Sequence, residues 1–129
     1  MNLARTYAIV FGAVYTLFGL IGFAVSSTLA VGTLILFPVN VLHNVVHLLV
    51  GVIGIAAFLT GRSVLYARGM AVLFAVLAVA GFLPTDSAGR FLGLVPIGGT
   101  DIVLHAATAL LGGLAGFAFA NNREERAVA

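Results

Sequence analysis

Four long apolar stretches, at residues 7–26, 40–60, 65–83 and 100–120, constrain what this chain can fold into. Each approaches the roughly 20 residues that a helix needs to cross a hydrocarbon core of about 30 Å. Hydrophobic residues make up 62% of the chain and charged residues only 8%. The stretches are continuously apolar rather than alternating, which disfavours transmembrane strands. We therefore predict an all-α integral membrane protein, a four-helix bundle forming one transmembrane domain over residues 1–129.

The positions of the arginines predict the orientation of this bundle. All but one lie on the same side of the expected spans: Arg5, Arg62, Arg68, Arg123 and Arg126. Arg90 lies in a loop on the opposite side. Cytoplasmic loops of membrane proteins carry an excess of Lys and Arg. We therefore expect both termini to be cytoplasmic, together with a polar tail over residues 121–129.

The amino-acid composition excludes some kinds of site and indicates where the protein is located. The chain has no Cys, which excludes disulfides and thiolate metal sites. It also has no Lys but abundant Ala, Gly, Val and Arg, a bias that indicates a GC-rich bacterial genome. The net charge of +2 reflects membrane topology. Nucleic-acid binding is not expected, because the sequence has no basic patch with interspersed aromatic residues. We expect a multi-pass protein of the bacterial plasma (inner) membrane.

An internal duplication organises the chain. An offset of 58 or 59 residues pairs matching or chemically related residues: Tyr7 with Tyr66, Gly22 with Gly81, Phe23 with Phe82, Pro38 with Pro96, Val39 with Ile97, His43 with Asp101, His47 with His105, and Gly54 with Gly112. The pairs predict two tandem two-helix repeats, at about residues 5–60 and 64–120. Since each repeat crosses twice, the copies should be related by a pseudo-twofold axis along the membrane normal.

The second and fourth spans each carry a polar face at helical spacing. The polar residues are Asn40, His43, Asn44 and His47 on the second span, and Asp101 and His105 on the fourth. Ionisable groups inside a membrane helix are costly and are a functional-site hypothesis by default. Small residues follow further along the same faces and predict close helix packing: Gly51, Gly54, Gly112 and Gly116.

Three interpretations of the polar cluster compete. His and Asp side chains can fasten helices by hydrogen bonds, which average only about 0.6 kcal/mol in membranes. Alternatively, His43, His47, Asp101 and His105 form an adequate ligand set for a divalent metal, and His47 and His105 could ligate a haem from two sides. A His–Asp pair could also handle protons or a small molecule.

These motifs resemble a known family. The stretch from Ala4 to Phe23, the run from Asn40 to His47 with the glycines that follow it, and Asp101–His105 are similar to the bacterial family called domain of unknown function 4383. The resemblance implies a small four-span membrane protein and supports the His/Asp positions. The chain departs from the expected pattern at Gly98–Gly99, where an Asn-like residue would open the fourth helix. A looser likeness is to DoxX-type membrane proteins, by architecture alone.

The leading hypothesis is a non-enzymatic membrane protein, either an accessory or structural subunit of a larger membrane complex or a homo-oligomer. Its expected partners are the lipid bilayer and other membrane subunits or a second copy of itself. The sequence contains no nucleophile–base pair, phosphate loop or paired carboxylates, the patterns that would predict an enzyme. The alternatives are a haem- or metal-binding protein, with the cofactor left open, and proton or small-molecule handling at the cluster.

Overall fold

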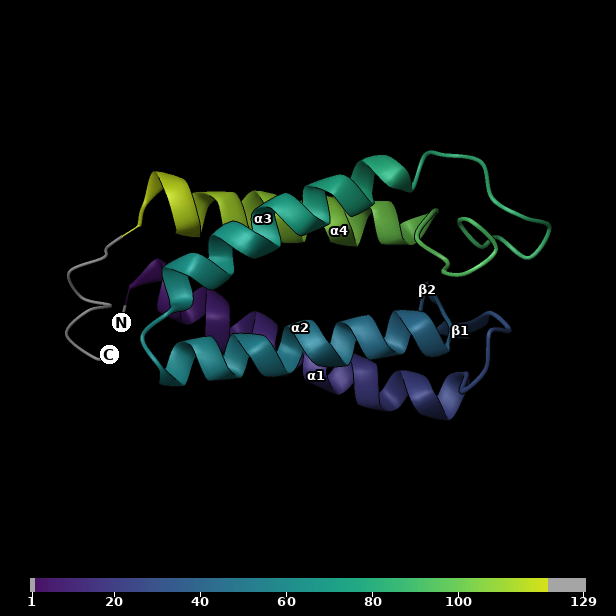
Figure 1. The fold of residues 1–129 in the computed structure, drawn as a ribbon, viewed down its shortest axis with the longest axis horizontal. Helices are drawn as coiled ribbons and strands as arrows, with labels where there is room; N and C mark the ends of the chain where they lie inside the picture. The colour runs from purple at the N-terminus through teal and green to yellow at the C-terminus, as the bar shows by residue number, and fades with distance from the viewer. Residues whose placement is uncertain (1, 121–129) are drawn as a thin grey trace.

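The computed structural model describes residues 2–120, in which four helices surround a narrow interior (Figure 1). The elements in chain order are α1 (Leu3–Val25), β1 (Gly32–Leu34), β2 (Phe37–Val39), α2 (Val41–Leu59), α3 (Ser63–Ala80), α4 (Thr100–Gly113) and η1 (Leu114–Ala118), a π-helical turn that continues α4. Counting α4 with η1 as one helix, all four are long and apolar enough to cross a membrane. The prediction of a mostly helical chain with four helices able to cross a membrane is confirmed. The predicted tail at 121–129 lies outside the described residues.

The helices pack as two antiparallel pairs, α1 with α2 and α3 with α4 (Figure 1). Glycines allow the close approach within the first pair. A Cβ at Gly12 would lie 2.8 Å from Ile55 N, and one at Gly19 would lie 2.7 Å from Leu48 N. Such small residues bring helix backbones into van der Waals contact, which drives association in lipid.

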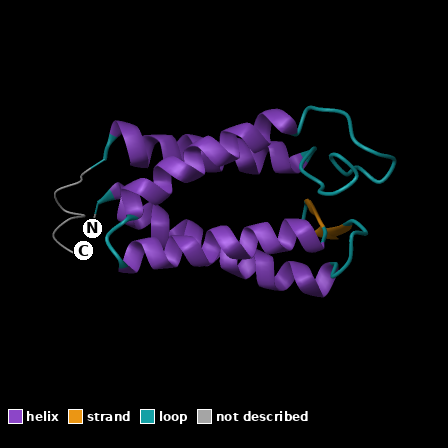
Figure 2. Cartoon of the chain, in the orientation of Figure 1, coloured by secondary structure: helices purple, strands orange, loops and turns teal. Residues whose placement is uncertain are grey.

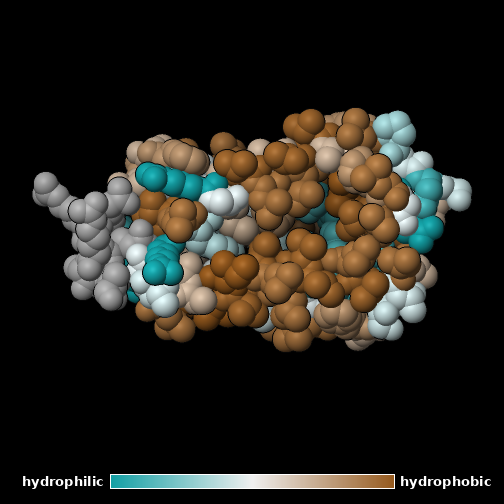
Figure 3. Space-filling view, in the orientation of Figure 1, coloured by the Kyte–Doolittle hydropathy of each residue, from teal (hydrophilic) through white to brown (hydrophobic). Residues whose placement is uncertain are grey.

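The exterior of the bundle is apolar and its interior holds the polar side chains. Each helix exposes large apolar residues, for example Leu17, Leu59, Val79 and Val103, which are 57–73% exposed. Hydrophobic residues cover the middle of the viewed face, and hydrophilic ones gather at its two ends (Figure 3). Apolar patches of this extent on a small protein indicate contact with lipid.

The two connections at one end of the bundle contain short β structure that the sequence analysis did not predict (Figure 2). β1 and β2 form an antiparallel hairpin in which Gly32 pairs with Val39. In the α3–α4 connection, Phe91 bridges to both Thr85 and Val95. Strands of three residues are too short to show a period in sequence. The hairpin and the second connection together cover this end of the bundle.

At the opposite end, arginines bond the last turns of the even-numbered helices. Arg5 Nη1 donates to the Phe58 carbonyl of α2 at 3.1 Å, and Arg68 Nε donates to the Gly116 carbonyl of η1 at 2.7 Å. The last carbonyls of a helix have no partner within the helix, so a neighbouring cation satisfies them. The first contact holds α1 to α2, and the second holds α3 to the end of the fourth helix.

Candidate functional site

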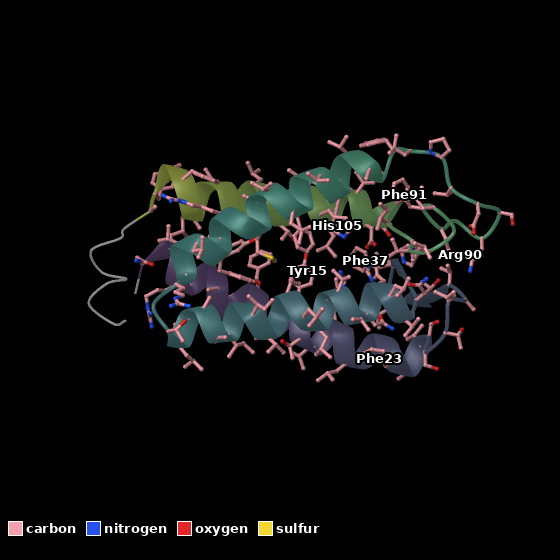
Figure 4. The ribbon with its side chains drawn as sticks, viewed as in Figure 1. Tyr15, Phe23, Phe37, Arg90, Phe91 and His105 are labelled. Atoms are coloured by element: carbon pink, nitrogen blue, oxygen red, sulfur yellow. The ribbon has the colours of Figure 1, made fainter. Side chains whose placement is uncertain are left out.

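The predicted polar residues are buried in the interior, towards the end that carries the hairpin. They are Asn40, His43, Asn44, His47, Asp101 and His105. His105 of α4 and Tyr15 of α1 both point into the space between the two helix pairs (Figure 4). The structure brings four of the predicted residues into one cluster, which we call the histidine cluster: His43, His47, Asp101 and His105.

A hydrogen bond between His43 and Asp101 joins the two halves of this cluster. His43 Nε2 lies 2.6 Å from Asp101 Oδ2, and His105 Nε2 lies 3.9 Å from the same oxygen. An ionised carboxylate can only accept hydrogen bonds, so His43 donates from Nε2. In the neutral form of this ring, Nδ1 then carries a lone pair that can accept a bond. Asp101 thereby fixes both the orientation and the tautomer of His43.

One nitrogen of each imidazole in the histidine cluster lacks a hydrogen-bond partner among residues 2–120. These atoms are His43 Nδ1, His47 Nε2 and His105 Nδ1. One potential ligand atom from each histidine lies within 4.8 Å of those of the other two. Buried polar atoms are normally paired, and an unpaired one costs about 1–3 kcal/mol. Hydrogen bonds that fasten helices would not leave one nitrogen unpaired on each of three neighbouring rings.

A small cavity of about 70 Å³ adjoins the three histidines. Its remaining walls are apolar: Val46 of α2, Phe74 and Leu77 of α3, and Val95 and Ile97 of the α3–α4 connection. A cavity of this size has room for an ion with a small ligand or for a water molecule or two. Because Val95 and Ile97 belong to the α3–α4 connection, this connection closes the cavity at the hairpin end of the bundle.

Asn40 and Asn44 lie beside the histidine cluster and are bonded elsewhere. The Asn40 side chain accepts from His43 N at 3.1 Å, capping α2, and its Nδ2 donates to Leu94 O at 2.6 Å. Asn44 Nδ2 donates to Ser26 O at 2.8 Å, at the C-terminal end of α1. Both residues position α2 and its neighbours, and in this structure neither joins the cluster.

Two aromatic residues that the sequence analysis did not include line the histidine cluster. The Tyr15 ring meets His47 edge-on at 4.8 Å between centroids, and Phe74 meets His105 edge-on at 5.2 Å. Tyr15 Oη also lies 2.6 Å from Thr108 Oγ1, one turn beyond His105. The 59-residue offset could have found them, because it pairs Tyr15 with Phe74 just as it pairs Tyr7 with Tyr66.

The four predicted packing glycines contact other helices of the same chain. A Cβ at Gly54 would lie 2.7 Å from Tyr66 Oη, and a Cβ at Gly112 would lie 2.9 Å from Tyr7 Oη. Gly51 lies against Thr16 of α1, and Gly116 against Arg68 of α3. These close approaches build the bundle itself.

The fold and the cluster define a small multi-pass membrane protein with buried histidines at its core. The chain belongs to the family described as Domain of unknown function (DUF4383), which matches residues 5–118. Comparison with curated proteins and with solved structures found no match.

Proposed function

We propose that this protein binds a single transition-metal ion within the membrane, through His43, His47 and His105. The observation that carries the proposal is the grouping of three buried histidines, each with a potential ligand atom within 4.8 Å of those of the other two. Each of these rings also has one nitrogen without a hydrogen-bond partner in residues 2–120. Neutral imidazole suits zinc, copper, iron and nickel. Three histidines with a fourth position left open are a common catalytic or exchangeable zinc arrangement.

Asp101 supports this assignment as a positioning residue. Metal-bound histidines usually donate their second ring N–H to a carboxylate, which orients the ring and raises its basicity. The His43–Asp101 bond of 2.6 Å has that form. The negative charge also offsets part of the cost of holding a cation in a low-dielectric interior.

The dimensions of the site favour an ion over a haem. Metal–nitrogen bonds of about 2.0–2.1 Å place two ligand nitrogens at most roughly 4 Å apart. Small rotations of the imidazoles would bring nitrogens within 4.8 Å to that separation. The adjoining cavity is about 70 Å³, whereas sites for larger organic ligands measure roughly 300 Å³ or more.

We favour metal binding over the hypothesis that the protein is an accessory subunit or a homo-oligomer. Glycine-rich faces were one ground for that hypothesis, and the four predicted packing glycines contact helices of the same chain. We propose a binding protein rather than an enzyme, because no nucleophile–base pair or paired carboxylates are found in the sequence.

We further propose that the chain is a duplicated helix pair in a bacterial inner membrane, with the Arg-rich end cytoplasmic. Equivalent residues of the two repeats make equivalent contacts: Tyr7 Oη donates to Thr108 O and Tyr66 Oη to Val50 O, each at 2.9 Å. Of the described arginines, Arg90 is the one that lies at the opposite end. These contacts and charges support the duplication and the orientation.

The test is metal content of protein purified in mild detergent and then equilibrated in turn with Zn²⁺, Cu²⁺ and Fe²⁺. We expect one ion per chain by elemental analysis after removal of loosely bound metal. His47→Asn and His105→Asn should lose the ion while eluting as the wild type does on size-exclusion chromatography.

Thr108→Val provides the control, because it removes a buried hydroxyl beside the cluster without touching a proposed ligand. It should keep the ion. Substoichiometric metal in the wild type with all three ions, or an unchanged content in a His47→Asn/His105→Asn double variant, would overturn the proposal. The remaining interpretations of the histidine cluster would then be helix fastening and proton or small-molecule handling.

A further inference from the structure

A second site lies at the other end of the bundle, in a groove between α2 and α3. The groove has a volume of about 570 Å³ and is lined mainly by apolar residues. Its walls include Val50, Ile53 and Ala57 from α2, and Leu65, Met70 and Leu73 from α3. A hollow between these two helices is visible on the apolar face of the molecule (Figure 3).

Gly69 of α3 opens the wall of this groove. A Cβ at Gly69 would meet no atom within 4 Å, in contrast to the packing glycines, whose added Cβ atoms would collide with a neighbouring helix. The other polar groups nearby are satisfied: Tyr66 Oη donates to Val50 O and Thr60 Oγ1 to Ala56 O. The groove therefore presents an apolar slot to the bilayer.

Arg62 places a positive charge at the mouth of the slot. Of the described arginines at this end, Arg5 bonds the Phe58 carbonyl and Arg68 the Gly116 carbonyl. The Arg62 side chain is exposed and makes no hydrogen bond or ion pair with other described residues. Its guanidinium lies at the end of the groove, where it can meet an anion at the membrane surface.

We propose that the groove between α2 and α3 binds an anionic phospholipid, with its phosphate on Arg62 and one acyl chain in the slot. Arginine pairs with phosphate through two parallel hydrogen bonds. Basic pockets between transmembrane helices on the cytoplasmic side take anionic lipid headgroups. This inference is independent of the metal site.

The length and width of the slot fit one lipid chain. At 1.5 Å per residue, Arg62 and Leu73 are separated by about 16 Å along α3. That is about half of the roughly 30 Å hydrocarbon core, the depth of a single leaflet. A partner helix is about 10 Å across with its side chains, whereas a groove of 570 Å³ has the size of a site for one small molecule.

The experiment is native mass spectrometry of the full-length protein in detergent with equal amounts of phosphatidylglycerol and phosphatidylcholine. We expect one retained phosphatidylglycerol. Arg62→Gln should reduce its retention roughly tenfold or more, because the glutamine amide is uncharged and can keep only one of the two hydrogen bonds to the phosphate, and Arg62→Lys should retain part of it. Gly69→Leu, which fills the slot and keeps the cation, should reduce retention similarly.

Two matched controls separate this site from general effects. Arg90→Gln removes the same charge at the opposite end, and Gly113→Leu adds the same side chain on α4, where a Cβ also meets nothing within 4 Å. Both should bind as the wild type does. Equal retention of the two lipids, no loss in Arg62→Gln or in Gly69→Leu, or an equal loss in Arg90→Gln would overturn the proposal. Each variant should keep its metal content, so failure here is distinguishable from failure of the metal site.

Discussion

His43 and Asp101 are bonded to each other at 2.6 Å across the interior, and they stand 58 positions apart at matching places in α2 and α4. In an exact repeat, two histidines or two aspartates would face each other here. Two buried carboxylates at this distance repel strongly, whereas a His–Asp pair attracts. The difference between the two halves of the chain therefore produces the contact that joins them.

Asp101→Asn should weaken metal binding without abolishing it. The amide keeps the shape of the side chain but removes the charge that orients His43, and loss of such a supporting carboxylate typically costs 10–100-fold in affinity. Competition titration against a chromophoric chelator measures the change. His47→Asn, which removes a ligand, should lose binding altogether. Unchanged affinity in Asp101→Asn would leave the residue as a helix fastener.

Tyr7→Phe and Tyr66→Phe should destabilise the protein by similar amounts. Each variant loses one buried hydrogen bond of 2.9 Å to a carbonyl of the other helix pair. Such a bond is worth about 0.5–1.5 kcal/mol, and about 0.6 on average in membranes. Denaturation in mixed micelles gives the change in the free energy of unfolding. A loss confined to one of the two variants would count against equivalent roles in a duplicated bundle.

Gly112→Ala and Gly113→Ala should change stability in opposite directions. A Cβ at Gly112 would lie 2.9 Å from both Ala67 O and Tyr7 Oη, so the helices must separate at a cost of about 1–3 kcal/mol. A Cβ at Gly113 meets nothing within 4 Å, and alanine there should stabilise α4 by about 0.5–1 kcal/mol. The melting temperatures of the two variants and the wild type, measured in the same detergent, test this prediction. Equal shifts would disprove the proposed contact with α3.

Single cysteines should report the orientation, because the natural chain has none. Ser87→Cys in the α3–α4 connection and Thr60→Cys at the end of α2 are both exposed positions. With the Arg-rich end cytoplasmic, a membrane-impermeant maleimide added to intact cells should label Ser87→Cys alone. Both should react after the cells are broken. Labelling of Thr60→Cys in intact cells would reverse the topology.

The turn at Asp86 should open only at acidic pH. The Arg90 backbone N–H, which donates to Asp86 Oδ1, is the largest influence holding the pKa of this carboxyl below its ordinary value, and the Arg90 guanidinium adds to it. A depressed pKa means that the turn is stabilised above the unfolded value of about 3.9 and loses that stabilisation as the pH falls through the lower, folded value. In an NMR titration, the ¹³C chemical shift of the Asp86 carboxyl should change with a midpoint below pH about 3.9. Arg90→Gln should raise that midpoint. An Asp86 midpoint at or above the ordinary value would contradict the turn.

Much of the architecture could be predicted from composition and run length. Four apolar stretches become four helices because unpaired backbone groups are costly in lipid and a helix pairs its own. The i, i+4 spacing of His43 and His47 likewise puts them on one face of α2, however that helix packs. The β hairpin was missed because its strands are short, and Tyr15 and Phe74 were missed because aromatic residues are common in membrane helices.

The sequence alone therefore determined the number of helices and the face on which each polar residue lies. Only the tertiary structure decided which faces meet. It paired His43 with Asp101, turned Asn44 towards α1 and left a groove between α2 and α3. In lipid most residues on both the buried and the exposed sides of a helix are apolar, so the hydrophobic pattern alone cannot choose the packed face. The choice is made by close packing at glycines and by the few polar groups that must find partners.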